Sequence, residues 1–186
     1  MKRIVLFASG AGSNAENIIR YFSDSHELEF PFIISNRPDA GVHERAKKLG
    51  ISSYSFKKND FETGEVLKFL QDNAINFIVL AGFLLKIPDN LLKAYPNKII
   101  NIHPALLPKF GGKGMYGSHV HEAVVAAGEK ESGITIHYVN ENYDKGQIIF
   151  QACCPVLPTD SPDDVATKVH ALEYEHFPRV IRDILK

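Results

Sequence analysis

Short apolar runs alternate with amphipathic stretches throughout the first half of the chain. Residues 4–8 form a continuous apolar run, which is typical of a strand buried on both faces of a sheet. Similar runs predict strands at 30–35, 51–56, 77–81 and 98–102. Helical periodicity and end signals predict helices at 13–22, 39–49, 60–73 and 88–94. This repeated strand–helix–strand order predicts a twisted, mostly parallel sheet.

The pattern changes in the second half. Residues 104–118 contain two Pro and four Gly and predict a long loop, and long loops in compact domains usually carry function. Beyond the loop the pattern predicts a helix, two strands and a last helix, at 119–127, 134–139, 147–156 and after a cap at Thr159 or Ser161. The short connection between the two strands favours an antiparallel hairpin. We therefore predict an α/β, single-domain, Rossmann-like fold, with a mostly parallel sheet flanked by helices and an antiparallel hairpin in the C-terminal half.

Composition narrows the class of protein. The chain has 186 residues, of which 45% are hydrophobic and 23% charged, and a net charge of −1, so neither a disordered chain nor a basic nucleic-acid binder is expected. The two cysteines, Cys153 and Cys154, are neighbours, a spacing that suits neither a disulfide nor a zinc site, and the histidines show no metal-ligand constellation. No stretch reaches transmembrane length, and the apolar start is too short for a signal peptide, so we expect a cytoplasmic protein without membrane or metal binding.

Residues 9–14, with the sequence Ser-Gly-Ala-Gly-Ser-Asn, connect the first strand to the first helix. Glycines let backbone N–H groups approach a ligand, and the helix start adds the positive end of a dipole, so Gly12, Ser13 and Asn14 are candidates for binding phosphate. Ala15 stands where a dinucleotide fingerprint has its third Gly, and the Lys of a P-loop is absent, which favours a single phosphate ester over NAD or ATP. A tight turn with a helix cap is the alternative.

A second group of polar residues surrounds the end of a buried strand. Asn101 and His103 alternate onto one side of that strand, at the carboxyl end where open α/β sheets place their sites. An amide that stabilises an oxyanion and an imidazolium that delivers a proton suit a carbonyl substrate. This interpretation needs Asp144, in the hairpin turn, to fold back beside His103 and favour its charged form. His137 and Thr135 are expected to support the cluster, and ordinary turn and core roles are the alternatives for these residues.

Together these motifs resemble the phosphoribosylglycinamide formyltransferase family, over essentially the whole chain. Residues 12–14 resemble the family's phosphate loop, and residues 81–83 its strand end beside the folate site. Residues 101–108, Asn-Ile-His-Pro-Ala-Leu-Leu-Pro, resemble the formyltransferase signature, and Asp144 with Gly146 resembles the partner acid of that signature.

The resemblance implies a reaction and its small molecules. It implies transfer of the formyl group of 10-formyltetrahydrofolate, the cosubstrate, to the amine of phosphoribosylglycinamide in de novo purine (IMP) biosynthesis. The amine attacks the formyl carbon directly, without a metal, a nucleic acid or a covalent enzyme intermediate. A single formyltransferase domain at 1–186 is implied, with a phosphate-binding Rossmann-like half at 1–100 and a half at 101–186 that holds the catalytic loop, hairpin and final helix. A monomer or homodimer is expected.

The resemblance also assigns roles to individual residues. The catalytic residues are Asn101, His103 and Asp144. The residues that bind the ribonucleotide substrate are Gly12, Ser13, Asn14 and, in the final helix, Glu173. The residues that bind folate are Leu84, Leu85, Lys86, Ile87 and Asn101.

Other functions share part of this pattern. The Asn-Ile-His-Pro block also resembles formyltransferases that act on another amine and a formyltetrahydrofolate hydrolase, so these enzymes are the alternatives. A nucleotide-binding regulatory module is the non-enzymatic alternative, although the complete set of polar residues favours an enzyme. The chain departs from the family pattern in a longer loop at 110–118 and in Gly64, which stands where a basic residue near the folate tail is expected. Lys57 or Lys58 is the candidate substitute.

Overall fold

The computed structural model describes residues 1–186 and divides them into two compact units, Met1–Asn101 and Ile102–Lys186. The elements of the first unit are β1 (Lys2–Phe7), α1 (Ser13–Tyr21), β2 (Leu28–Glu29), β3 (Phe32–Ser35), α2 (Val42–Leu49), β4 (Ser52–Ser55), α3 (Lys58–Glu62), α4 (Glu65–Asp72), β5 (Phe77–Leu80), α5 (Asp89–Ala94) and β6 (Ile99–His103), whose last two residues belong to the second unit. The second unit continues with α6 (Ser118–Ala126), β7 (Glu131–Tyr138), β8 (Ile148–Pro155) and α7 (Pro162–Leu185).

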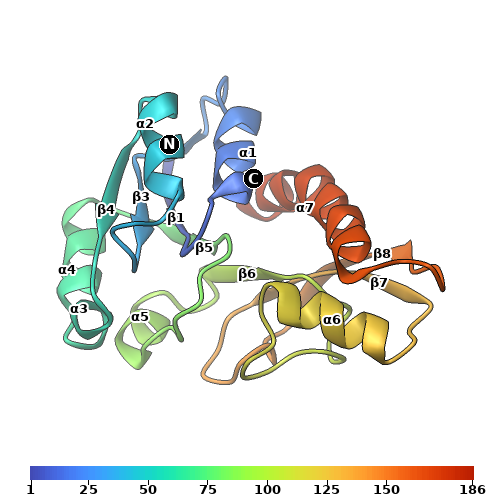
Figure 1. The fold of residues 1–186 in the computed structure, drawn as a ribbon. Coiled ribbons are helices and arrows are strands. Elements are labelled where there is room, and N and C mark those ends of the chain that lie inside the picture. Colours follow the sequence, from blue (N-terminus) through green and yellow to red (C-terminus); the bar gives the residue numbers. More distant parts are fainter. The chain divides into compact units, whose positions relative to one another are not determined.

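The first unit is built on a parallel sheet with strand order β4-β3-β1-β5-β6, and the short β2 pairs with β1. Residues 4–8 have no exposed surface, as the continuous apolar run predicts for a central strand. Helices α1 and α2 cover one face of this sheet, and α3, α4 and α5 cover the other (Figure 1). The carboxyl ends of β1 and β5 therefore meet at one edge, beside Asn101 of β6, and α/β folds place their sites at such an edge.

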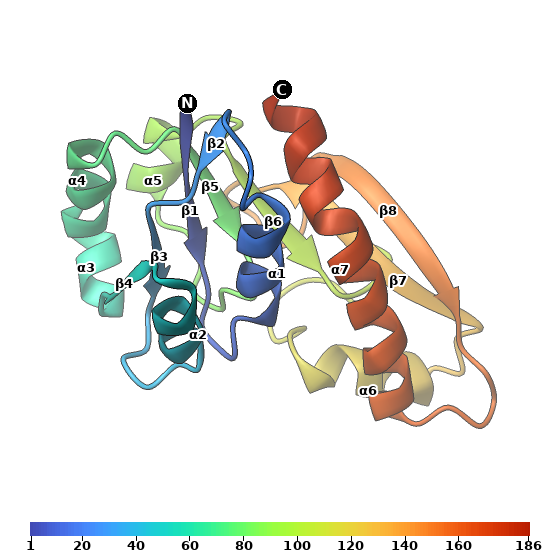
Figure 2. The same ribbon diagram turned by 90° about the horizontal axis from the view of Figure 1, so that it is seen from above.

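The second unit is built on the antiparallel hairpin of β7 and β8, whose register shifts between Ile136 and His137. Helix α7 lies along this hairpin, and α6 packs against α7 (Figure 2). Of the two predicted caps for the last helix, Ser161 is the correct one. Its hydroxyl accepts a hydrogen bond from the backbone N–H of Asp164, whose carboxylate accepts one from the backbone N–H of Ser161 in return.

The predicted α/β class, with a mostly parallel sheet, flanking helices and a C-terminal antiparallel hairpin, is confirmed. One helix prediction is wrong, because residues 60–73 form α3 and α4 rather than a single helix. Gly64 separates them with a φ of 89°, a left-handed conformation that interrupts a right-handed helix. Asp60 lies inside α3, where its carboxylate accepts a hydrogen bond from the backbone N–H of Lys57.

Candidate functional site

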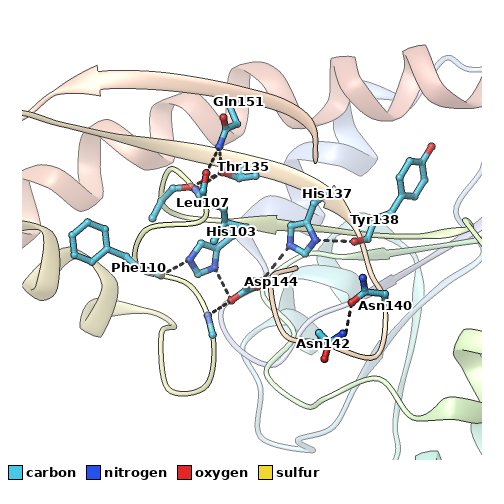
Figure 3. Close-up of polar contacts among 12 residues, drawn as sticks. His103, Leu107, Phe110, Thr135, His137, Tyr138, Asn140, Asn142, Asp144 and Gln151 are labelled. Atoms are coloured by element: carbon cyan, nitrogen blue, oxygen red, sulfur yellow. Dashed lines mark hydrogen bonds and ion pairs between the residues drawn. The ribbon is translucent and has the colours of Figure 1, made fainter. Parts of the chain in front are cut away.

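His103 ends β6 in the second unit, and its side chain is buried. Its Nε2 donates a 2.7 Å hydrogen bond to the backbone carbonyl of Phe110, and its Nδ1 lies 3.6 Å from Oδ2 of Asp144 (Figure 3). Both partners are acceptors, and a neutral imidazole has only one N–H. Both ring nitrogens of His103 therefore face an acceptor.

Asp144 joins the hairpin turn to the loop at 104–118. Besides facing His103, its Oδ2 accepts a 2.8 Å hydrogen bond from the backbone N–H of Gly112. The close approach depends on two glycines, because a Cβ at Gly111 would lie 2.5 Å from Leu107 Cδ2 and a Cβ at Gly146 would lie 1.6 Å from the carbonyl oxygen of Tyr138. The carboxylate thus fixes the loop and the turn to each other around the imidazole.

His137, on β7, faces the other oxygen of the same carboxylate. Its Nε2 lies 3.7 Å from Oδ1 of Asp144, and its Nδ1 donates a 2.9 Å hydrogen bond to the carbonyl of Tyr138. Burial lowers the pKa of His137 despite the opposing effects of that carbonyl and of Asp144. The structure therefore brings together His103, His137 and Asp144, and burial disfavours a charge on His137.

Thr135 is fully buried and acts on the loop rather than on the carboxylate. Its hydroxyl donates to the carbonyl of Ala105 at 2.7 Å and accepts from the backbone N–H of Leu107 at 3.0 Å. Gln151, which pairs with Thr135 across the hairpin, donates to both the Thr135 hydroxyl and the Leu107 carbonyl (Figure 3). Sequence reasoning missed Gln151, although a polar residue in an otherwise apolar strand was the available signal.

The turn at residues 9–14 belongs to the first unit, where Gly12 is the N-cap of α1 with a φ of 75°. A Cβ at Gly12 would lie 2.3 Å from Cγ2 of Val42, so only glycine fits. No side chain caps the start of α1. The backbone N–H groups of Ser13 and Asn14 thus stand at the positive end of the helix dipole.

A network that sequence reasoning missed supports this turn. Arg45, on α2, donates from Nε to the carbonyl of Ala11 at 2.7 Å and forms an ion pair with Glu16 on α1. Hydrogen bonds from Arg45 and Arg20 hold the pKa of Glu16 below its ordinary value. The buried hydroxyl of Ser9 accepts a 2.9 Å hydrogen bond from the backbone N–H of Leu84, which ties the turn to the segment after β5.

The expected folate-binding residues lie in the first unit and differ in exposure. Leu84 and Lys86 are exposed, Leu85 is half-buried, and the side chain of Ile87 is buried. Asn101, on β6, pairs in register with Leu80 of β5 and is half-buried.

Glu173 lies on α7 in the second unit, and its carboxylate is buried. His170, one turn earlier, lies with Nδ1 3.0 Å from Oε2 of Glu173. Sequence reasoning gave His170 no role, although its spacing of three residues from Glu173 on a helix was a signal for a pair.

Two further findings bear on the prediction that the protein binds neither a membrane nor a metal. None of the helices combines the length and the hydrophobicity that crossing a bilayer requires. No three His, Cys, Asp or Glu side chains are grouped as metal ligands, and the expectation that the protein uses no metal stays a prediction.

Comparison with known proteins gives consistent matches. The formyl transferase family model matches residues 2–181. A relative from Bacillus subtilis, named phosphoribosylglycinamide formyltransferase, is 36% identical over 100% of this chain and 95% of its own length. A chloroplastic enzyme of the same name from Arabidopsis thaliana is 39% identical over 97% of this chain. This chain spans 64% of that plant relative and 60% of another, from Vigna unguiculata.

Solved structures of similar chains show the same fold. The structure of phosphoribosylglycinamide formyltransferase from Streptococcus pneumoniae TIGR4 is 37% identical and superposes with a TM-score of 0.87, with 100% of both chains covered. The structure of glycinamide ribonucleotide transformylase 1 from Symbiobacterium toebii gives a TM-score of 0.91 at 30% identity, over 100% of this chain and 88% of that one.

Proposed function

The chain belongs to the formyl transferase family, and we propose that it transfers the formyl group of 10-formyltetrahydrofolate to the amine of phosphoribosylglycinamide, in purine biosynthesis. The names of the relatives and of the similar structures support this choice of substrate. The observation that carries it is the position of the Asp144 carboxylate, 3.6 Å from Nδ1 of a histidine whose Nε2 already donates a proton to a carbonyl.

In the proposed reaction the amine attacks the formyl carbon, and the new C–N bond forms first, which gives a tetrahedral intermediate. The bond from that carbon to the folate nitrogen then breaks. Asn101 donates its amide N–H to the oxyanion of the tetrahedral intermediate. His103 redirects its Nε2 proton from the Phe110 carbonyl towards the developing charge and assists departure of the folate nitrogen. Asp144 keeps His103 charged and receives, through water, the proton that the amine loses. The leaving folate nitrogen takes a proton from His103, and the proton that Asp144 received from the amine replaces it.

The remaining residues bind and orient the substrates. The phosphate of the ribonucleotide is proposed to bind at Gly12, Ser13 and Asn14, where it supplies binding energy remote from the reacting atoms. Glu173 accepts hydrogen bonds from the same substrate. The folate-binding segment is 84–87, in which the exposed Leu84 offers apolar surface to a flat ring.

The supporting residues and the setting complete the proposal. Thr135 holds the loop that begins at residue 104, and the buried ring of His137, fixed by its hydrogen bond to the Tyr138 carbonyl, packs beside the Asp144 carboxylate. We propose that the enzyme acts in the cytoplasm on small molecules, as a monomer or homodimer, without a metal.

A coupled assay tests the proposal by following release of tetrahydrofolate with the ribonucleotide, with other primary amines, and with no amine. Rapid release only in the presence of the ribonucleotide supports the proposed function. Equal release with several amines indicates a different acceptor, and release of formate without any amine indicates a hydrolase. Either of these two results contradicts the proposed function.

A further inference from the structure

The pair formed by His170 and Glu173 lies outside the His103 cluster, on α7. The side chain of Glu173 is only 6% exposed, whereas that of His170 is 50% exposed. The distance of 3.0 Å between Nδ1 and Oε2 is that of a hydrogen bond. A solvent-facing imidazole therefore holds a carboxylate that is almost fully removed from water.

A buried carboxylate stays ionised only when a partner compensates for the lost hydration. The hydrogen bond to Glu173 raises the pKa of His170 above its ordinary value, and partial burial of the ring opposes this effect. His170 is therefore charged at a pH where a free histidine has begun to lose its proton.

The neighbours of His170 leave Glu173 as its ionic partner. On the same helix, the ring of Tyr174 stacks on it with centroids 6.3 Å apart. From α6, the ring of His121 lies with its centroid 6.3 Å from that of His170. His121 is buried with no hydrogen-bond partner at Nδ1, and burial, His170 and His103 together lower its pKa, against an opposing effect of Glu173. His121 thus stays neutral while His170 carries the charge.

We propose that His170 is a positioning residue for ribonucleotide binding: its charged ring holds the Glu173 carboxylate oriented to accept hydrogen bonds from the hydroxyl or amine groups of that substrate. The inference rests on the proposed function, because it takes the ribonucleotide as the ligand of Glu173. An ionised carboxylate is an acceptor on both oxygens, and Oε2 is anchored by His170. His170 acts through Glu173 and need not touch the substrate.

This role makes ribonucleotide binding depend on pH with a defined sign. The pKa of His170 is raised in the folded enzyme, so its contribution is complete below about pH 6.5 and is lost as the pH rises through the raised value. Above it, the ring is neutral and no longer places a positive charge beside the Glu173 carboxylate. We expect the KM for the ribonucleotide to rise by about three- to tenfold, the range of a charged hydrogen bond that is partly exposed to solvent.

The test compares wild type, His170→Gln and His170→Ala from pH 6 to 9, with kcat and both KM values measured by formyl transfer. Glutamine keeps a donor for Glu173 but does not titrate. The phosphate and the amine of the substrate also titrate in this range, but they do so equally with every variant. His176→Gln is the matched control, because His176 lies on the same helix, 3.9 Å from a carboxylate of Glu175 that is half exposed. Circular dichroism and thermal unfolding establish that each variant is folded.

The inference predicts that the ratio of wild-type to His170→Gln KM for the ribonucleotide rises with pH. It also predicts that His170→Ala has a raised KM at every pH with kcat nearly unchanged, that the KM for the folate does not respond, and that His176→Gln follows wild type. Superimposable profiles of wild type and His170→Gln in active enzymes overturn this inference alone, as does an unchanged KM in His170→Ala. If wild type itself does not formylate the ribonucleotide, the proposed function fails and this inference fails with it.

Discussion

Replacing Asp144 by Asn removes one negative charge from the centre of the His103 cluster and changes little else. The amide oxygen of Asn can still accept the hydrogen bond that the carboxylate receives from the backbone N–H of Gly112. Residue 144 has a φ of 53°, a left-handed conformation that Asn tolerates better than Ala does. The Asn variant therefore keeps the loop and the turn in place while it removes the charge.

The expected loss follows from the distance between the two charges. Unit charges 3.6 Å apart, as Nδ1 of His103 and Oδ2 of Asp144 are, attract by about 4–5 kcal/mol at an effective dielectric constant of roughly 20. The side chains are only 4% and 12% exposed, which limits screening by water. Because each 1.36 kcal/mol of barrier changes the rate about tenfold, losing about 4–5 kcal/mol should lower kcat by about a thousand- to five-thousandfold. This range agrees with the typical cost of losing a proton-transfer group, roughly a hundred to ten thousandfold.

Steady-state kinetics of tetrahydrofolate release measures this loss, with both KM values determined alongside kcat. Both should change by less than about threefold, because Asp144 acts on the reacting groups and the binding residues are intact. Asp160→Asn is the matched control. Asp160 is also a sheltered carboxylate of the second unit that accepts a backbone N–H and pairs with a lysine, but it does not contact His103. A folded Asp144→Asn enzyme with kcat within about threefold of wild type would refute the reasoning.

Three further changes test other parts of the structure. Gly12→Ala places a Cβ 2.3 Å from Cγ2 of Val42 and strains a φ of 75°. We therefore expect the free energy of unfolding in urea to fall by about 1–3 kcal/mol and the KM for the ribonucleotide to rise. If both stay unchanged, the proposed phosphate turn is contradicted. Thr135→Val leaves the N–H of Leu107 and the carbonyl of Ala105 without the Thr135 hydroxyl. The free energy of unfolding in denaturant titrations should fall by about 2–4 kcal/mol. A fall below about 0.5 kcal/mol would count against the role of Thr135 in holding the loop. Because burial lowers the pKa of His121 in the folded state, the unfolded chain binds its proton first on acidification, and stability should fall between about pH 7 and 5. The fall should be shallower in His121→Gln, and equal slopes in urea titrations would show that His121 does not contribute.

Much of the fold could be predicted because its signals are local. The continuous apolar run at 4–8 predicted a central strand, and α2 ends at Leu49, as the helix predicted at 39–49 does, because Gly50 takes a left-handed φ of 70°. The break at Gly64 could not be predicted, because apolar periodicity continues across it and one glycine does not by itself show a left-handed conformation. The two-residue β2 is too short to give any pattern.

In the candidate site, too, residues with a local signal could be predicted and their long-range partners could not. Asn101, His103 and Asp144 stood out because polar residues at a strand end and in a hairpin turn suit carbonyl chemistry. Partners such as Gln151 and Arg45 were missed, since each acts on backbone groups that lie 44 and 34 residues away in the sequence. Such long-range hydrogen bonds depend on how the elements pack, and no local pattern encodes them.

The most direct test of the central claim follows a ¹³C-labelled formyl group by NMR, with wild type and His103→Ala each given the labelled folate and the ribonucleotide. The account predicts that wild type moves the label to the glycinamide nitrogen, and that the variant does so at least about a hundredfold more slowly. Label that appears as formate, or label transferred equally fast by the variant, would contradict it.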